Sequence, residues 1–176
     1  ARAIAPGFDA EKVLTAPLNI NLLRYTRTQG REFYRQTLER VAALPGIEAV
    51  SLARGVPLSG FSSVRGLMIE GQKGIDDVYR SEGGNTVAND ANVISVNTVT
   101  PNYFTTMGIA RVQGRDFDAQ DTEEKPGIAI VNETFVKRHF KCEAALGKRI
   151  SMRGQQGPWL EIVGVVRDSK YATIGE

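Results

Sequence analysis

Two side chains suited to acid–base or nucleophilic chemistry occur once each among the 176 residues, His139 and Cys142. A Ser/His/Asp triad would have to use this histidine as its base. The histidine, however, shares one face of a predicted amphipathic helix with Phe135, Val136 and Phe140. That pattern favours a helix-packed histidine over a catalytic base. Cys142 could meet His139 on one helical turn, but the helix should end there, which favours a bystander thiol.

Three carboxylates resemble the start of a calcium-binding loop, Asp116, Asp118 and Asp121. The EF-hand pattern requires oxygen ligands at its first, third and fifth positions, a glycine at the sixth and a glutamate at the twelfth. Here the fifth position is Gln120, the sixth is Asp121 and the twelfth is Gly127. The pattern therefore favours Asx turns and caps over a specific calcium site.

Four arginines recur at helical spacing, Arg24, Arg27, Arg31 and Arg35. If a helix begins early enough, they form a stripe that could meet anionic headgroups, an acidic partner or nucleic acid. A solvated helix face is the alternative, and the pattern favours it. We keep the four as candidate partner-facing residues. Neither a Walker sequence nor a dinucleotide-binding glycine motif follows a predicted strand. We therefore expect no cofactor, no metal site and no nucleic-acid partner.

Composition is that of an ordinary globular domain, with a net charge of +2 and a pI near 8.8. Such a mild positive charge does not by itself indicate nucleic-acid binding. A lone cysteine excludes an intramolecular disulfide and a Cys-based zinc site. No apolar run is long enough to span a bilayer, and the N-terminus lacks the hydrophobic segment of a signal peptide. We expect either a soluble protein or a soluble piece of a larger one.

The first half of the chain predicts a β-α-β unit. Residues 11–23 show partial strand alternation, with Pro17 suggesting an edge position or a bulge. Residues 28–44 have the apolar spacing of an amphipathic helix that ends at Pro45-Gly46, and residues 47–58 read as the next strand. A further strand is expected through Val64, Leu67 and Ile69, followed by a long mobile loop near 72–92.

The second half predicts a strand over 93–99, a short aromatic helix and a turn at 114–117. A strand over 128–131 should lead through the N-cap Asn132 into the helix that carries His139. Strands over 148–152 and 159–166 should flank a glycine-rich hairpin loop.

Five stretches together resemble the extracytoplasmic domain of MacB/FtsX-type ABC transporter permeases, and within them the duplicated permeases common in acidobacteria. The stretches are 33–60, 96–121, 128–140, 145–150 and 159–171. They occur in family order and cover most of the chain. The resemblance implies an α+β, two-lobed domain with a porter-like β-α-β lobe containing a mixed sheet, and a smaller sabre-like α/β lobe.

On that mapping, residues 1–110 form the first half of the porter-like lobe and residues 111–176 the sabre-like lobe. The family's second porter half is absent after Tyr171, which would leave a sheet edge exposed. Gly108, Gly114, Arg115 and Asp116 would then lie at the lobe junction, where motion could pass between the lobes.

The resemblance implies a non-enzymatic module of the bacterial inner membrane, exposed to the periplasm and anchored through flanking helices. Its expected partners are a second permease copy or repeat, an ATPase subunit acting through the membrane domain, and a periplasmic adaptor or lipoprotein. It would couple ATP-driven motion to export or to that partner, with the transported substrate unspecified. The alternatives are a stand-alone periplasmic ligand-binding or adaptor domain and, third, a soluble α/β enzyme.

Overall fold

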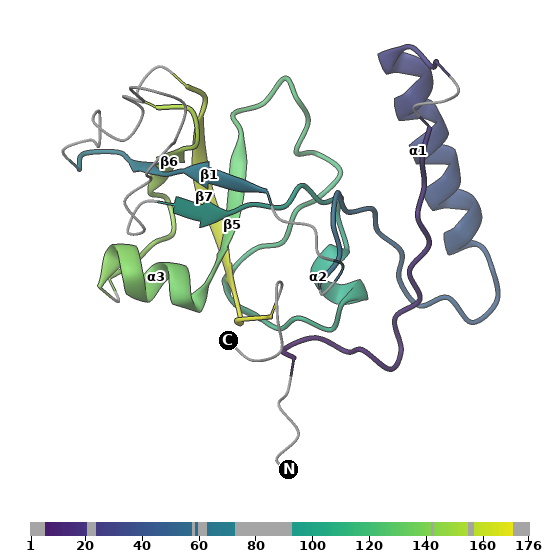
Figure 1. Cartoon of the computed structure of the whole chain (residues 1–176), viewed down its shortest axis with the longest axis horizontal. Coiled ribbons are helices and arrows are strands. Elements are labelled where there is room, and N and C mark those ends of the chain that lie inside the picture. The colour runs from purple at the N-terminus through teal and green to yellow at the C-terminus, as the bar shows by residue number, and fades with distance from the viewer. Residues whose placement is uncertain are drawn as a thin grey trace, which may run out of the picture.

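The computed structural model describes residues 6–20, 24–57, 59, 63–72, 93–141, 143–154 and 157–170. Within these ranges the chain forms three helices and seven strands (Figure 1). None of the helices in these ranges combines the length and the hydrophobicity that a membrane span needs.

A five-stranded sheet is built around its longest strand, β7 (Trp159–Val166). Strand β5 (Ile128–Asn132) runs parallel to β7. Strand β6 (Arg149–Ser151) pairs antiparallel with the first residues of β7, and β4 (Arg111–Gly114) pairs antiparallel with the last ones. Strand β2 (Met68–Ile69) extends the sheet from β6. The mixed sheet with its helices confirms the predicted α+β class.

Two hydrophobic clusters share β7. In the first, Ile162 is fully buried and packs with Ile150 and with Phe140 of α3 (Glu133–Phe140). The second contains Tyr103 of α2 (Tyr103–Thr106), Met107 and Ile109 from the residues that follow α2, and Val166 of β7. We call the five-stranded sheet with α2 and α3 the sheet body, because these clusters bind its elements together.

Helix α3 begins where the sequence predicts. The Asn132 side chain accepts a hydrogen bond from the Phe135 backbone N–H at 3.0 Å, which satisfies one of the free donors of the first turn. Lys141 ends the helix in the left-handed conformation, at φ 49°. The predicted strand, N-cap and helix are thus confirmed.

Helix α1 (Arg27–Ala42) is the predicted amphipathic helix of residues 28–44. Thr26 and Gln29 form a reciprocal capping box at its start. Gly30 is its buried residue, and a Cβ there would lie 3.3 Å from the Ile20 Cδ1 atom of the preceding extended segment. The helix stands beside the sheet body and shares no broad packing with its described helices and strands (Figure 1).

Two predicted strands of the first half are wrong where the structure describes them. Residues 13–20 are extended but join no ladder, in keeping with Pro17, which has no N–H to donate. Residues 47–57 form one isolated bridge, between Ala53 and Val99. Side chains replace the rest of the ladder there: the Asn97 amide exchanges two hydrogen bonds with the Gly55 backbone.

The predicted strand around Leu67 is split in two. Strand β1 (Val64–Gly66) pairs with β3 (Val93–Ser95) in a separate two-stranded sheet, whereas β2 joins the main sheet. The break at Leu67 allows this side chain to enter the first cluster. The main sheet therefore uses strands from both sides of residue 110. The expected loop over 72–92 lies outside the described residues from position 73 on.

Candidate functional site

Two glycines of the predicted lobe junction hold positive φ angles at close backbone contacts. Gly108 has φ 65°, and a Cβ there would lie 2.9 Å from the Asp9 Cβ atom. Gly114 has φ 73°, and a Cβ there would collide with the carbonyl oxygen of Val163 in β7. Only glycine suits a position that combines a left-handed backbone with so near a neighbour. The junction is therefore a tightly packed corner of the sheet body.

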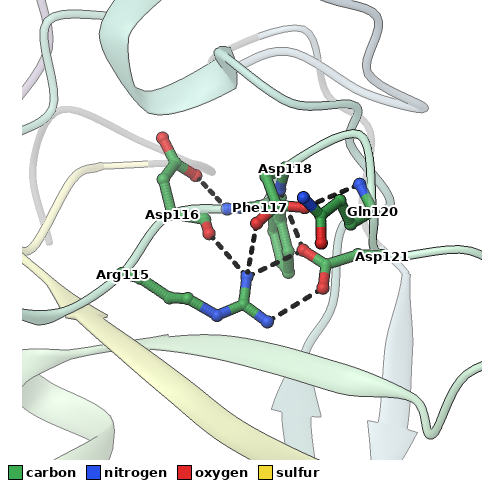
Figure 2. Close-up of polar contacts among 6 residues, drawn as sticks. All are labelled: Arg115, Asp116, Phe117, Asp118, Gln120 and Asp121. Atoms are coloured by element: carbon green, nitrogen blue, oxygen red, sulfur yellow. Dashed lines mark hydrogen bonds and ion pairs between the residues drawn. The ribbon is translucent and has the colours of Figure 1, made fainter.

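Arg115 fixes the loop that leaves this corner (Figure 2). Its guanidinium donates to both carboxylate oxygens of Asp121, each at 2.8 Å, and to the backbone carbonyl of Asp116 at 3.0 Å. Its backbone N–H donates to the Val163 carbonyl at 2.9 Å. Because the guanidinium binds both oxygens of the Asp121 carboxylate, this bidentate contact fixes the relative orientation of the two side chains. Residues 114–121, which we call the Arg115 strap, are therefore tied to β7.

The three aspartates of the Arg115 strap hold its turns. Asp116 Oδ1 accepts from the Phe117 N–H at 2.7 Å, and Asp118 Oδ1 accepts from the Gln120 N–H at 2.6 Å (Figure 2). Asp121 Oδ2 accepts from the Asp118 N–H at 2.8 Å. Asp118 thus forms the predicted Asx turn, and Asp116 and Asp121 hold the loop through other local bonds to backbone N–H groups. No group of His, Cys, Asp and Glu in the described ranges is arranged to hold a metal ion.

The Arg115–Asp121 pair predicts a pH effect on stability. The Arg115 hydrogen bond is the main cause that lowers the pKa of Asp121 from 3.8 to about 2. Because the folded chain holds the charged form more strongly, this contribution is present above pH 3.8 and is lost as pH falls toward about 2. In Asp121→Asn, the loss of stability over this pH interval should be shallower than in the unmodified chain. Urea unfolding followed by circular dichroism at each pH measures it.

The exposed Glu143→Gln is the matched control, since it removes one carboxylate outside the strap. If the free energy of unfolding falls equally steeply with decreasing pH in Asp121→Asn and in the unmodified chain, the Arg115–Asp121 pair does not have the assigned role.

Three arginines of the predicted stripe form ion pairs with carboxylates of this chain. Arg27 donates to Glu123 at 2.8 Å, and Arg31 pairs with the other oxygen of the same carboxylate. Arg35 pairs with Glu32 and Glu39 on α1 itself. The pKa of Glu123 is lowered, chiefly by Arg31. Three of the four arginines are thus engaged within the chain.

Arg24, the fourth member of the stripe, lies before α1 with φ 47° and lines a hollow of about 350 Å³. The side chains of Tyr25 and Tyr34 line the same hollow. A partner that binds this face would meet a mixture of aromatic and cationic groups there.

His139 packs on its own helix, with its ring 4.7 Å from that of Phe135. Burial lowers the pKa of His139, and the neighbouring charge of Arg138 lowers it further. This confirms the helix-packed interpretation of the histidine. Cys142 lies outside the described residues.

Sequence reasoning missed two acidic residues that join distant segments. Asp168 accepts from the backbone N–H and from the hydroxyl of Thr134, both at 2.8 Å, which ties the end of β7 to the start of α3. Glu123 connects α1 to the loop before β5. The parallel pairing of β5 and β7 would have indicated the first contact, because the ends of parallel neighbours meet at one sheet edge. No sequence signal indicated the second.

Comparison with known proteins gives a family and a fold. Residues 18–175 match the model of the family described as the MacB-like periplasmic core domain. The crystal structure of the periplasmic region of MacB from Actinobacillus actinomycetemcomitans has a TM-score of 0.52 at 18% identity, over 80% of this chain and 56% of that one. The chain matches no curated protein sequence.

The extracellular domain of the noncanonic ABC-type transporter YknZ from Gram-positive bacteria has a TM-score of 0.44 at 17% identity, over 77% of this chain and 58% of that one. The chain thus spans just over half the length of both solved domains. Because the family match extends over nearly the whole sequence, this chain belongs to the family of MacB-like periplasmic core domains.

Proposed function

We propose that this chain is the extracytoplasmic module of an ABC transporter permease and that it passes ATP-driven motion on to a periplasmic partner. The family match and the MacB-like fold support the assignment to a permease. In this proposal the module itself is non-catalytic and lies on the periplasmic side of the bacterial inner membrane. The ATPase acts through the membrane domain, and the partner is a second permease copy or repeat, an adaptor or a lipoprotein.

The transmission of motion is inferred from the hydrogen bonds that residues 6–9 and 168–170, on either side of the sheet body in the sequence, form with it and with each other. The Asp9 N–H donates to the Met107 carbonyl at 2.9 Å, and the Lys170 N–H donates to the Pro6 carbonyl at 2.9 Å. In this proposal, these bonds and the Arg115 strap link residues 6–9 and 168–170 to the sheet. Motion applied at those segments would move the sheet body as a unit.

Helix α1 is held differently, because exposed ion pairs connect it to the loop before β5. Arg27 and Arg31 share Glu123, and all three side chains are largely exposed. Exposed ion pairs contribute little to stability and exchange readily. We therefore place the division between the two lobes at α1 with its flanking segments, and not at residue 110, since β2 and β4 belong to one sheet. Helix α1 would be the lobe that changes position.

Loss of Glu123 should loosen α1 without unfolding the chain. In Glu123→Gln, spin labels at Arg40 on α1 and Lys137 on α3 should give a broader distance distribution by pulsed electron paramagnetic resonance. The midpoint of urea unfolding should stay nearly unchanged, since such exposed pairs contribute only about 0–1 kcal/mol.

The neighbouring Glu124→Gln is the matched control, because it makes the same charge change in the same exposed loop. A distribution as narrow in Glu123→Gln as in Glu124→Gln would show that other contacts hold α1.

Crosslinking in the intact membrane tests the proposed function. Single cysteines at Arg24 and Arg35 of the full-length permease, with Cys142 replaced by serine, should give defined products with a second permease copy or with one periplasmic protein. Cysteines at Gln113 and Lys137 on the sheet body provide the comparison. If no site crosslinks under conditions in which the permease is active, the chain does not present an interaction surface and the proposal fails.

A further inference from the structure

Three arginines from separate segments line one surface hollow of about 200 Å³. Arg54 comes from the segment that bridges to Val99, Arg65 from β1, and Arg153 from the turn after β6. The rest of the described lining is Ser63, Val96, Thr98, Met152, Pro158 and Leu160. We call this the arginine hollow. None of its described lining residues is acidic.

Elsewhere in the described chain, several arginines pair with carboxylates. Arg27 and Arg31 share Glu123, Arg115 meets Asp121, and Arg149 pairs with Glu70. In the part of the chain that the structure describes, Arg65 and Arg153 form no ion pair. The Arg65 guanidinium donates to the Val64 carbonyl at 2.8 Å, which leaves its charge without a counter-ion among the described residues. Because Arg65 and Arg153 line the same hollow, their like charges repel each other, and an anion bound there would relieve that repulsion.

The backbone that carries these arginines is well fixed. The Arg54 N–H donates to the Thr98 carbonyl at 2.9 Å, next to the paired Asn97 and Gly55. On the opposite side, the fully buried Ser151 hydroxyl accepts from the Arg153 N–H at 3.2 Å and donates to the Gly154 carbonyl at 2.8 Å.

Gly157 lies close to Arg153, because a Cβ at Gly157 would meet the Arg153 Cβ atom and the Ser151 hydroxyl. The backbone at Arg54 and at Arg153 is therefore held in place before a ligand binds, which lowers the cost of ordering it.

The lining also identifies the kind of anion. Val96, Met152 and Leu160 line the same hollow as the arginines and give it an apolar part. A glutamate side chain matches this combination, since a carboxylate that can accept two parallel guanidinium bonds follows a short aliphatic stem. A phosphate group has no such stem, and at about 200 Å³ the hollow is smaller than the usual sites of small-molecule ligands.

We propose that the arginine hollow binds a glutamate side chain presented by an acidic segment of a partner protein. The inference specifies the partner surface of the proposed function, but the binding itself is measurable on the isolated chain. It would place a second contact on this protein, built from β1, the residues directly after β6 and the segment that bridges to Val99, and separate from the arginine stripe of α1.

A nuclear magnetic resonance titration of the 176-residue chain tests this proposal. The probe is the peptide acetyl-Leu-Glu-Val-Glu-Leu-amide, and its matched control replaces both glutamates with glutamine. The guanidinium Nε signals of Arg65 and Arg153 should shift saturably with the acidic peptide only, and affinity should fall at higher ionic strength. The double variant Arg65→Gln/Arg153→Gln should bind the acidic peptide at least about tenfold more weakly.

The charge-matched control is Arg40→Gln/Arg111→Gln, which removes two exposed arginines outside the hollow and should keep the original affinity. Inorganic phosphate and phosphatidylglycerol vesicles form two further arms of the titration. Equal affinity of the two double variants would overturn the proposal, as would equal binding of the glutamine peptide. Tighter binding of phosphate or vesicles than of the acidic peptide would also overturn it. None of these results depends on whether crosslinks form in the membrane, so the two proposals fail independently.

Discussion

Replacement of Gly114 by alanine is expected to lower the free energy of unfolding by about 2–4 kcal/mol, combining a left-handed backbone penalty with overpacking. Gly114 holds φ 73°, and an added Cβ would overlap the Val163 carbonyl and approach the Gly164 Cα atom at 2.9 Å. Both neighbours are backbone of the central strand, so they cannot move aside without disturbing the β4–β7 pairing. Urea unfolding followed by circular dichroism measures the loss.

Gly147→Ala separates the two causes of this loss. Gly147 has nearly the same backbone angle, φ 77°, but a Cβ there meets nothing within 4 Å. Its substitution should therefore cost only the conformational penalty of about 1–2 kcal/mol. If the two variants lose equal stability, close packing at the junction is not what fixes Gly114.

Replacement of Ile162 by alanine is expected to cost about 2–5 kcal/mol, the usual range for a large aliphatic side chain removed from a core. Ile162 is 0% exposed and lies in the first hydrophobic cluster, between the β5 and β6 sides of β7. Because several elements of the sheet body meet there, the cavity should weaken the whole unit and lower the midpoint of urea unfolding.

Leu14→Ala provides the control for this loss, since the Leu14 side chain is 94% exposed. Its change should stay within about 0.5 kcal/mol, as for most surface substitutions. A small loss for Ile162→Ala would mean that the sheet body does not depend on this cluster.

The second half of the chain could be predicted from sequence because its signals are local. Asn132 is a strong N-cap after an apolar β-branched run, and residues 159–166 are apolar enough to mark the central strand. The helix of residues 27–42 was likewise predictable from its apolar spacing and its end near Pro45-Gly46. In each case the residue propensities, the apolar periodicity and the residues at the element's ends indicate the same structure.

The first half could not be predicted as well, because its pairing depends on distant side chains. Residues 47–57 form a single bridge, and beside its backbone bonds the side chains of Asn97 and Thr100 take up the Gly55 backbone and the Leu52 N–H. The break at Leu67 is likewise set by a buried cluster whose other members come from later strands. Such contacts leave no periodic mark in the local sequence.

The candidate sites show the same limit. The Asx turn at Asp118 was predictable from the spacing of the acidic residues. The pairing of Arg115 with Asp121, and of α1 with Glu123, was not. The arginine hollow is assembled from three segments, so no single stretch of sequence indicates it. Ion pairs between exposed side chains depend on how the elements are placed, which is known only once the fold is formed.

In the proposed function, the sheet body moves as one unit while α1 changes position relative to it. Pulsed electron paramagnetic resonance on the full-length permease in membranes, with Cys142 replaced by serine, tests this directly. One label pair joins Gln113 on β4 to Lys137 on α3, and a second joins Arg40 on α1 to Lys137. Between the nucleotide-free and ATP-bound states, the first distance should stay constant and the second should change. A change in the first distance, or a constant second distance, would contradict the proposed movement of α1 relative to the sheet body.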